Sequence, residues 1–416
     1  METAAEPAGV PSCRFCSAPL RQTFVDLGMS PLCESYVPVE RLGAMEPFYP
    51  LHVRVCEQCL LVQLEELVSP EEIFTEYAYF SSYSDSWVAH ARDYVESVVE
   101  RFGLGADSQV VELASNDGYL LQHLVARGIP ALGVEPAANV AEAARERGIE
   151  TVVEFFGREL ASRLVAAGRR ADLLVANNVF AHVPDLNDFA AGMRLLLAPE
   201  GVVTIEFPHV ARLIEENQFD TIYHEHFSYF SFLTAGTVLR AHGLEVFDVE
   251  ELPTHGGSLR VYAQLEGAAH RVTARVAELA ERERELDLDR LEGYSSFAPR
   301  VAETKWRLLE FLIDCRRDGK RVAGYGAPGK GNTLLNYCGI RADLLEFTVD
   351  RNPYKQGQVL PGTRIPIHHP EALEQARPDF VLILPWNLTD EIVAQLSHVR
   401  EWGGRFVVPI PEVKVI

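Results

Sequence analysis

The sequence is poor in positive charge. Its 416 residues include 38 lysines and arginines against 60 aspartates and glutamates, which gives a formal net charge of −22. Such an excess of negative charge repels phosphate, so it excludes broad contact with nucleic acid or with an anionic membrane surface. An anionic ligand would need cations or backbone N–H groups placed at its own site.

Long hydrophobic runs are also missing. No stretch reaches the ~18 uninterrupted apolar residues of a membrane-spanning helix, and the first residues carry acid where a secretory signal carries base. We therefore expect a cytoplasmic protein without a membrane partner. Its length and 47% apolar content suffice for two large domains and a small one. The sequence does not determine the oligomeric state, for which a monomer is one expectation.

Cysteine is scarce, and the number of cysteines, seven, is odd, which disfavours a disulfide framework. Four of the seven form two Cys-x-x-Cys pairs, Cys13 with Cys16 and Cys56 with Cys59. Four thiolates can close a tetrahedral Zn²⁺ site, and a closed site leaves no open position for catalysis. The sequence therefore predicts structural zinc. Cys33, Cys315 and Cys338 have no such pairing and are expected in the core.

The remainder of the chain alternates between strand and helix patterns. After a helical run over 87–102, strands are expected at 109–114, 130–135, 171–176 and 201–206, and again at 320–325, 345–350, 380–384 and 405–409. This alternation predicts an α/β fold with two doubly wound parallel sheets. The expected domains are a zinc-binding module at 1–75, a Rossmann-like domain at 76–265, a helical connector with a solvated face at 266–310, and a second Rossmann-like domain at 311–416.

A polar turn follows the first strand of the central domain. It lets a ligand approach backbone N–H groups at the carboxyl edge of the sheet, and it is not the Gly-x-Gly-x-x-Gly of dinucleotide sites. The next strand ends at Glu135, whose carboxylate can bind both hydroxyls of a ribose. The expected cofactor ligands are Glu112, Ser115, Asn116, Gly118, Glu135, Asn177 and Asn178. Phe155 and Phe156 either flank an adenine or belong to the core.

Titratable side chains cluster at residues 223–226, and such clusters mark functional sites. Histidine is often neutral near pH 7, so His226 is a candidate base. Tyr223 lies three residues earlier and would share its face of a helical turn, which makes it the competing candidate. His224 would point elsewhere and is interpreted as structural.

Together, these motifs resemble the nucleotide-sugar C-methyltransferases of deoxysugar biosynthesis. The resemblance also covers the cysteine pairs, residues 254–260 and the glycine-rich residues 324–332, and so spans almost the whole chain. It implies a class I methyltransferase sheet that binds S-adenosylmethionine. The implied reaction is methylation of carbon 3 in a TDP-linked 4-keto-deoxysugar, a step in making antibiotic-type branched sugars.

This reaction requires a base and a group that stabilises an enolate. We expect His226 to be the base, with Tyr223 as competitor or proton relay. Glu225 would orient His226 or contact the zinc module. His182 or Tyr77 would donate a hydrogen bond to the enolate oxygen, and the role of Tyr77 rests mainly on the resemblance.

The glycine-rich residues 324–332 follow a strand and precede a helix, a geometry that favours an anion. They form either a cradle for the substrate's pyrophosphate or a tight structural turn, and they lack the context of an NTPase. The expected substrate-binding residues are Arg260, Tyr325, Gly329, Lys330, Asn332, Asp350, Arg351 and Lys355. The alternatives for the whole protein are O- or N-methylation of a similar sugar and a ligand-binding scaffold without catalysis.

Overall fold

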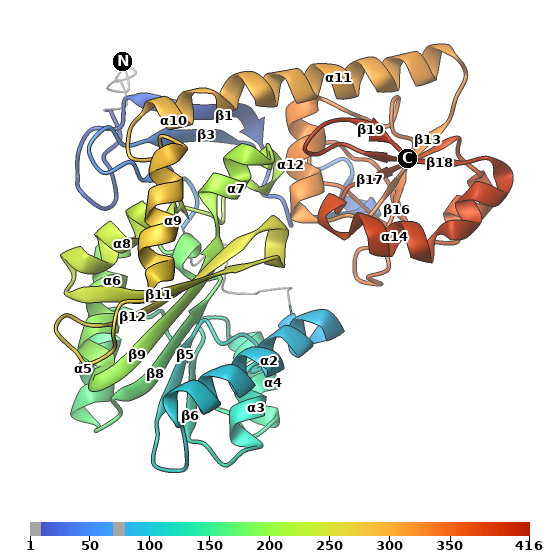
Figure 1. Cartoon of the computed structure of the whole chain (residues 1–416). Coiled ribbons are helices and arrows are strands. Elements are labelled where there is room, and N and C mark those ends of the chain that lie inside the picture. Colours follow the sequence, from blue (N-terminus) through green and yellow to red (C-terminus); the bar gives the residue numbers. More distant parts are fainter. Residues whose placement is uncertain (1–9, 70–79) are drawn as a thin grey trace, which may run out of the picture. The chain divides into compact units, whose positions relative to one another are not determined.

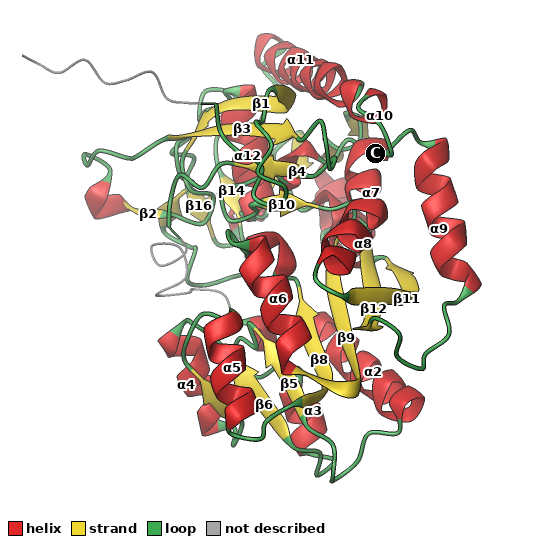
Figure 2. Cartoon of the chain, turned by 90° about the vertical axis from the view of Figure 1, so that its left-hand side faces the viewer, coloured by secondary structure: helices red, strands yellow, loops and turns green. Residues whose placement is uncertain are grey.

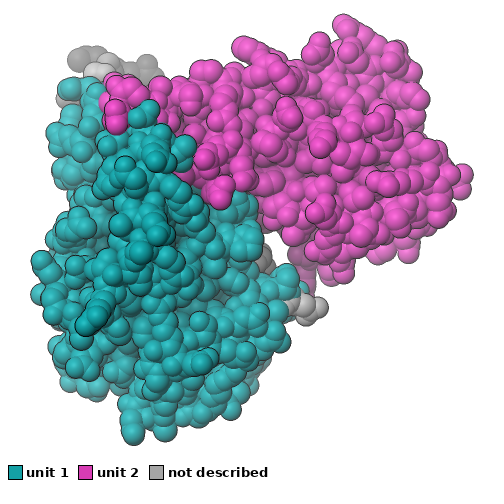
Figure 3. Space-filling model, viewed as in Figure 1, with its two compact units in different colours: residues 1–21, 56–209, 227–289 teal, residues 22–55, 210–226, 290–416 magenta. Residues whose placement is uncertain are grey.

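The computed structural model describes residues 10–69 and 80–416. The chain divides into two compact units, each assembled from separate segments (Figure 3). Unit 1 comprises Met1–Arg21, Cys56–His209 and Phe227–Asp289, and unit 2 comprises Gln22–Val55, Val210–His226 and Arg290–Ile416. The expected boundaries at 75, 265 and 310 remain a prediction. No helix of the described residues is long and apolar enough to cross a membrane.

Unit 1 is built on a seven-stranded sheet (Figure 1). Its strands are β5 (Val110–Leu113), β6 (Ala131–Val134), β7 (Glu150–Val152), β8 (Ala171–Asn177), β9 (Leu197–Pro208), β11 (Leu244–Leu252) and β12 (Ser258–Leu265). Their spatial order is β11-β12-β9-β8-β5-β6-β7. Strands β5 to β9 are parallel, whereas β12 runs antiparallel to both of its neighbours. The expected doubly wound sheet is confirmed, and the hairpin of β11 and β12 extends it.

Helices cover both faces of this sheet (Figure 2). The helices are α2 (Asp85–Phe102), α3 (Leu121–Val125) and α4 (Ala138–Glu146) on one face, and α5 (Arg158–Ala166), α6 (Leu186–Leu196) and α8 (Phe232–Ala241) on the other. Successive strand residues alternate between the two cores: Val110 packs with the first group and Val111 with the second. This period of two explains why the strands read as continuous apolar runs.

Helix α9 (Ala274–Glu285) lies within the segment expected to be a solvated connector. That expectation applies to most of its residues but is wrong for Glu283, which is buried. The Glu283 carboxylate accepts hydrogen bonds from the backbone N–H groups of Phe232 and Leu233 and lies 2.6 Å from His209 Nε2. Since these N–H groups belong to the first turn of α8, Glu283 caps that helix from another element.

Unit 2 contains a six-stranded sheet. Its strands are β13 (Val322–Tyr325), β14 (Thr348–Val349), β16 (Ile367–His368), β17 (Phe380–Ile383), β18 (Arg405–Val408) and β19 (Lys414–Val415), in the order β16-β14-β13-β17-β18-β19. All are parallel except β19. The second Rossmann-like sheet is thus confirmed, although β14 is only two residues long.

Part of the N-terminal sequence belongs to unit 2. Strands β1 (Gln22–Ser30) and β3 (Tyr49–Val55) form an antiparallel pair, and β2 (Val37–Pro38) pairs with β15 (Gln358–Val359). Phe24 of β1 stacks on Phe297 of α11 (Phe297–Arg317) with 4.6 Å between ring centroids. The remaining helices and strands are β4 (Val62–Leu64), β10 (Ser228–Tyr229), α7 (Val210–Glu215), α10 (Glu292–Ser295), α12 (Gly329–Cys338), α13 (Ala372–Ala376) and α14 (Thr389–Gln395).

Replacing Glu283 with alanine should lower the free energy of unfolding by about 3 kcal/mol, because it uncaps α8 and leaves buried His209 without its partner. Urea unfolding followed by circular dichroism measures this. The matched control is Glu281→Ala, whose exposed carboxylate pairs only with Arg284 on the same helix. It should change stability by less than ~0.5 kcal/mol. Equal effects of the two substitutions would contradict the capping role.

Candidate active site and zinc centre

The two Cys-x-x-Cys pairs form matching knuckles in unit 1. In each knuckle the backbone carbonyl of the first cysteine accepts a hydrogen bond from the N–H group four residues later. Ser17 N donates to Cys13 O and Leu60 N donates to Cys56 O, and both donor residues have a positive φ. The four Sγ atoms lie within 4.8 Å of one another, with Cys13 to Cys59 and Cys16 to Cys56 each at 3.5 Å. Tetrahedral zinc with bonds of ~2.3 Å requires sulfurs roughly 3.8 Å apart, so the thiols fit a structural zinc ion.

Side chains beyond the cysteines support this centre and attach it to helix α6 of unit 1. Gln63 Nε2 donates to Cys13 Sγ at 3.1 Å, while its carbonyl accepts from the backbone of Arg14. Asn187, on α6, donates to the backbone carbonyl of Phe15 at 3.0 Å. Sequence reasoning missed these supports, because nothing in the spacing of Gln63 or Asn187 links them to the cysteines.

The carboxylate of Glu135 joins the two loops that follow β5 and β6. Its Oε2 accepts from Asn116 N and its Oε1 from Ala137 N, both at 2.9 Å. Positive φ angles at Ala114, Asn116 and Gly118 turn the first loop across the carboxyl edge of the sheet. Each Glu135 oxygen keeps a second acceptor position, so the expected contact with a ribose stays possible and remains a prediction.

Several buried polar atoms at this edge have no hydrogen-bond partner among the described residues. They are Glu112 Oε2, Ser115 Oγ, Asn177 Oδ1, and both amide atoms of Asn178. Burial raises the pKa of Glu112, with nearby Glu135 and Asp117 adding repulsion. Because buried polar groups are almost always satisfied, this set fits a ligand with several donors and acceptors, as S-adenosylmethionine is. Asn178 also has a strained φ of 52°.

The two adjacent phenylalanines lie in different environments. Phe156 packs edge-on against Phe189 in the core, with centroids 5.3 Å apart, whereas Phe155 is 45% exposed. Of the two, only Phe155 is therefore free of core packing and available to an adenine ring. The cofactor role of both residues remains a prediction.

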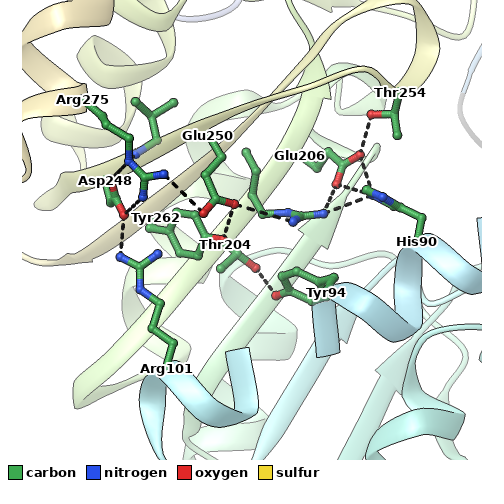
Figure 4. Close-up of polar contacts among 12 residues, drawn as sticks. His90, Tyr94, Arg101, Thr204, Glu206, Asp248, Glu250, Thr254, Tyr262 and Arg275 are labelled. Atoms are coloured by element: carbon green, nitrogen blue, oxygen red, sulfur yellow. Dashed lines mark hydrogen bonds and ion pairs between the residues drawn. The ribbon is translucent and has the colours of Figure 1, made fainter. Parts of the chain in front are cut away.

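Arg260 belongs to a buried charge network in unit 1, of which Figure 4 labels His90, Tyr94, Glu206 and Thr254. In the antiparallel pairing of β12 with β9, Arg260 lies directly opposite Glu206. Its guanidinium donates to the Glu206 carboxylate at 2.5 Å and lies 4.4 Å from the ring centre of Tyr94. His90 and Thr254 also bind the Glu206 carboxylate. Despite burial, hydrogen bonding to His90 and the charge of Arg260 hold the Glu206 pKa at about 2. Arg260 thus neutralises Glu206, and its contact with substrate remains a prediction.

Residues 223–226, here called the base turn, form a tight turn in unit 2. His226 N donates to Tyr223 O at 3.0 Å, and the two rings lie with centroids 4.2 Å apart. The expectation that these side chains share a face is confirmed. His224 points to other groups: its Nε2 lies 3.3 Å from Pro50 O, and its ring packs edge-on against Tyr49.

Glu225, which lies between His224 and His226 in sequence, is buried, and none of the described residues forms an ion pair with it. Burial, with added repulsion from Glu34, raises the pKa of its carboxyl to about 8. The group is therefore mostly protonated at pH 7, a state that sequence reasoning could not anticipate. His182 lies in unit 1, in the turn Phe180–His182 after β8. Tyr77 lies outside the described residues.

In unit 2 the other expected substrate residues gather at the carboxyl edge of β13 and β14. Asp350 accepts from Ala327 N at 2.7 Å, and Lys355 donates to Ala327 O at 2.9 Å and to Tyr36 OH at 2.8 Å. These contacts clamp the glycine-rich loop from both sides. Asn332 donates to Cys33 O at 2.6 Å, and Arg351 is exposed. Their role in binding substrate remains a prediction.

Replacing Cys56 with serine should reduce bound zinc from about one equivalent per chain to near zero and lower the melting temperature, because three ligands cannot close the site and metal binding is coupled to folding. Elemental analysis and thermal unfolding measure both effects. Cys315→Ser, at a buried cysteine outside the cluster, should keep its zinc. Full zinc occupancy in the Cys56 variant would refute the four-thiolate site.

Replacing Glu225 with glutamine should remove a pH-dependent loss of stability. A carboxyl raised from 4.5 to about 8 contributes stability that is complete below pH 4.5 and falls by ~1.4 kcal/mol per pH unit up to about pH 8. Between pH 4.5 and about 8, the unfolding free energy of wild type should therefore fall relative to that of Glu225→Gln. Glu215→Gln, at an exposed carboxylate, is the control, and a pH-independent difference for Glu225→Gln would argue against the protonated carboxyl.

Family models match three consecutive parts of the chain. They describe a zinc binding domain over residues 13–74, a methyltransferase domain over 87–249 and a C-methyltransferase C-terminal domain over 253–411. The C-methyltransferase NovU of Streptomyces niveus is 39% identical over 407 residues, which cover 98% of this chain and 97% of NovU.

Solved structures resemble part of the chain. The CcbJ methyltransferase of Streptomyces caelestis is 13% identical, with a TM-score of 0.35 and coverage of 42% of this chain and 90% of that one. The magnesium protoporphyrin IX methyltransferase of Synechocystis PCC 6803, solved with bound S-adenosylmethionine, is 15% identical, with a TM-score of 0.33 and coverage of 44% and 82%. On the identity and coverage of NovU and the order of the three domain models, the chain belongs to the C-methyltransferase family, as an S-adenosylmethionine-dependent enzyme with an N-terminal zinc site.

Proposed function

We propose that this enzyme methylates carbon 3 of a TDP-linked 4-keto-deoxysugar, a step toward antibiotic-type branched sugars. The main support is the base turn, where the rings of His226 and Tyr223 lie 4.2 Å apart next in sequence to a buried carboxyl. A carbon beside a ketone becomes a nucleophile when a base removes its proton, so C-methylation of a keto sugar needs such a group. NovU is itself a C-methyltransferase, which favours carbon over oxygen or nitrogen as the acceptor.

His226 is the base in this proposal. Its neutral imidazole takes the carbon-3 proton, the electron pair of the C–H bond moves into the bond between carbons 3 and 4, and the negative charge appears on the carbonyl oxygen. Tyr223, in ring contact with His226, is the alternative base or passes the proton to solvent afterwards. Exchange of the carbon-3 proton with solvent in variants of His226 and Tyr223 distinguishes which of the two residues is the base.

The developing enolate oxygen needs a hydrogen-bond donor. Glu225 suits this task because a carboxyl with a pKa of about 8 is protonated at pH 7 and can donate. His182 and Tyr77 are proposed for the same task, and Glu225 would then orient His226. Burial of Glu225 would strengthen its contact with the enolate oxygen, since no water competes for the charge.

S-adenosylmethionine supplies an electrophilic methyl group on a sulfonium centre. In unit 1, Glu135 and the unpartnered atoms of Glu112, Ser115, Asn177 and Asn178 would hold it at the carboxyl edge of β5, β6 and β8. Fixing donor and acceptor in one orientation can supply ~7–11 kcal/mol of the barrier reduction. For the sugar nucleotide, the proposed contacts are Arg260 and the residues at the edge of β13 and β14, with Arg351 exposed there.

Incubation with ¹³C-methyl S-adenosylmethionine and a TDP-4-keto-6-deoxysugar, followed by NMR, should place the label on sugar carbon 3. Label on oxygen or nitrogen would overturn the reaction but keep the donor. Binding of both ligands without transfer would favour a ligand-binding scaffold or a different sugar.

His226→Asn should abolish transfer and also the exchange of the carbon-3 proton with deuterated solvent, because both require the base. Tyr223→Phe should retain exchange. The matched control is His224→Asn, in the same turn but facing Tyr49 and Pro50, which should exchange at nearly the wild-type rate. Exchange that survives in His226→Asn and disappears in Tyr223→Phe would assign the base to Tyr223.

A further inference from the structure

The residues just before the base turn contact side chains of helix α12 and of the 3-10 turn Trp386–Leu388. Asp220, in the 3-10 turn Phe219–Thr221, accepts a hydrogen bond from the indole N–H of Trp386 at 2.7 Å. Thr333, on α12, donates to the backbone carbonyl of Ile222 at 2.9 Å. Phe219 packs edge-on against Tyr337 of the same helix, with centroids 5.4 Å apart. All these residues belong to unit 2.

Half-buried Lys330 contacts two further residues of this group. Its Nζ donates to Asn387 Oδ1 at 2.7 Å and lies 4.8 Å from the ring centre of Trp386. Burial lowers the pKa of Lys330, and the attraction of Asp220 opposes that shift. Burial likewise raises the pKa of Asp220 to about 6, with Lys330 and the Trp386 N–H opposing it.

The geometry ties this group to the chemistry through the backbone. Ile222 immediately precedes Tyr223, and Asp220 lies three residues before it, so a displacement of either moves the turn that carries His226. Asp220 has no exposed surface, which leaves no water to replace the Trp386 N–H if that donor is lost. A misplacement of about 1 Å at a catalytic group can cost on the order of 100-fold in rate.

We propose that Asp220, Trp386 and Lys330 form a positioning network for the base turn, and that Lys330 therefore contributes to turnover rather than to binding of the substrate's phosphates. This proposal rests on the proposed function of the base turn, and it replaces the phosphate contact expected for Lys330. It also gives Trp386, Asp220 and Asn387 a task that no sequence motif indicates.

The first test removes one hydrogen bond at a time with little change of shape. Trp386→Phe and Thr333→Val should each lower kcat for methyl transfer about tenfold or more, with KM for the sugar nucleotide and for S-adenosylmethionine within about twofold of wild type. The matched control is Trp402→Phe, which also loses an indole N–H bond, here to Pro378 O at 3.0 Å, but touches nothing next to the base turn. Wild-type kcat in both Trp386→Phe and Thr333→Val would overturn the proposal.

The second test reports on the turn without any turnover. The ¹³Cε1–H resonance of His226 in histidine-labelled full-length protein, assigned by its loss in His226→Gln, should shift in Trp386→Phe and stay unchanged in Trp402→Phe. An unchanged His226 resonance in Trp386→Phe would overturn the positioning role even if kcat falls. Because this readout needs no sugar, it separates failure of the positioning network from failure of the proposed reaction.

The third test concerns Lys330 alone and uses TDP as the probe. Calorimetric titration of Lys330→Met with TDP should give a Kd within about twofold of wild type, while the His226 resonance shifts. A Kd raised tenfold or more with an unchanged His226 resonance would mean that Lys330 binds phosphate, and it would overturn the proposal for this residue.

Discussion

Burial of carboxyl groups is the constraint on which both halves of this protein depend. A carboxylate without water must accept hydrogen bonds, pair with a cation or keep its proton. Glu206 pairs with Arg260 and stays ionised, with a pKa of about 2, whereas Glu225 pairs with no cation of the described part of the chain and has a pKa of about 8. Glu135 accepts hydrogen bonds from two backbone N–H groups. The cost of burying a carboxylate is thus offset by an ion pair at Glu206, by protonation at Glu225 and by backbone hydrogen bonds at Glu135.

In each parallel sheet the polar side chains discussed above gather at the carboxyl edge, on the strand ends and on the loops that follow them. In unit 1 this edge carries buried amide and carboxylate atoms without a hydrogen-bond partner among the described residues, and their binding of the methyl donor remains our proposal. In unit 2 the corresponding loops clamp themselves through Asp350 and Lys355 and hold the segment that leads into the base turn. The zinc knuckles add rigidity at the chain's start, with Asn187 attaching them to α6.

Much of this could be predicted from local patterns. The four cysteines, the alternation of strands and helices and the sharing of one face by Tyr223 and His226 depend on short spacings, and the structure agrees with each. The burial of Glu283 could not be predicted, because its helix carries many charged residues and nothing local distinguishes Glu283 from them. Only the start of α8, about 50 residues earlier, makes its burial favourable. The pairing of Arg260 with Glu206 needed the antiparallel register of β12 on β9, which no local pattern specifies.

The sequence by itself determined the class of fold, the metal site and the family, because these follow from residue types at fixed spacings and from similarity along the whole chain. Only the tertiary structure decided the charge states and partners of the buried groups. The raised pKa of Glu225, the contact of Lys330 with Trp386 and the unit that carries the base turn all depend on residues distant in sequence. Desolvation and pairing energies arise from proximity in space, and proximity exists only once the chain has folded.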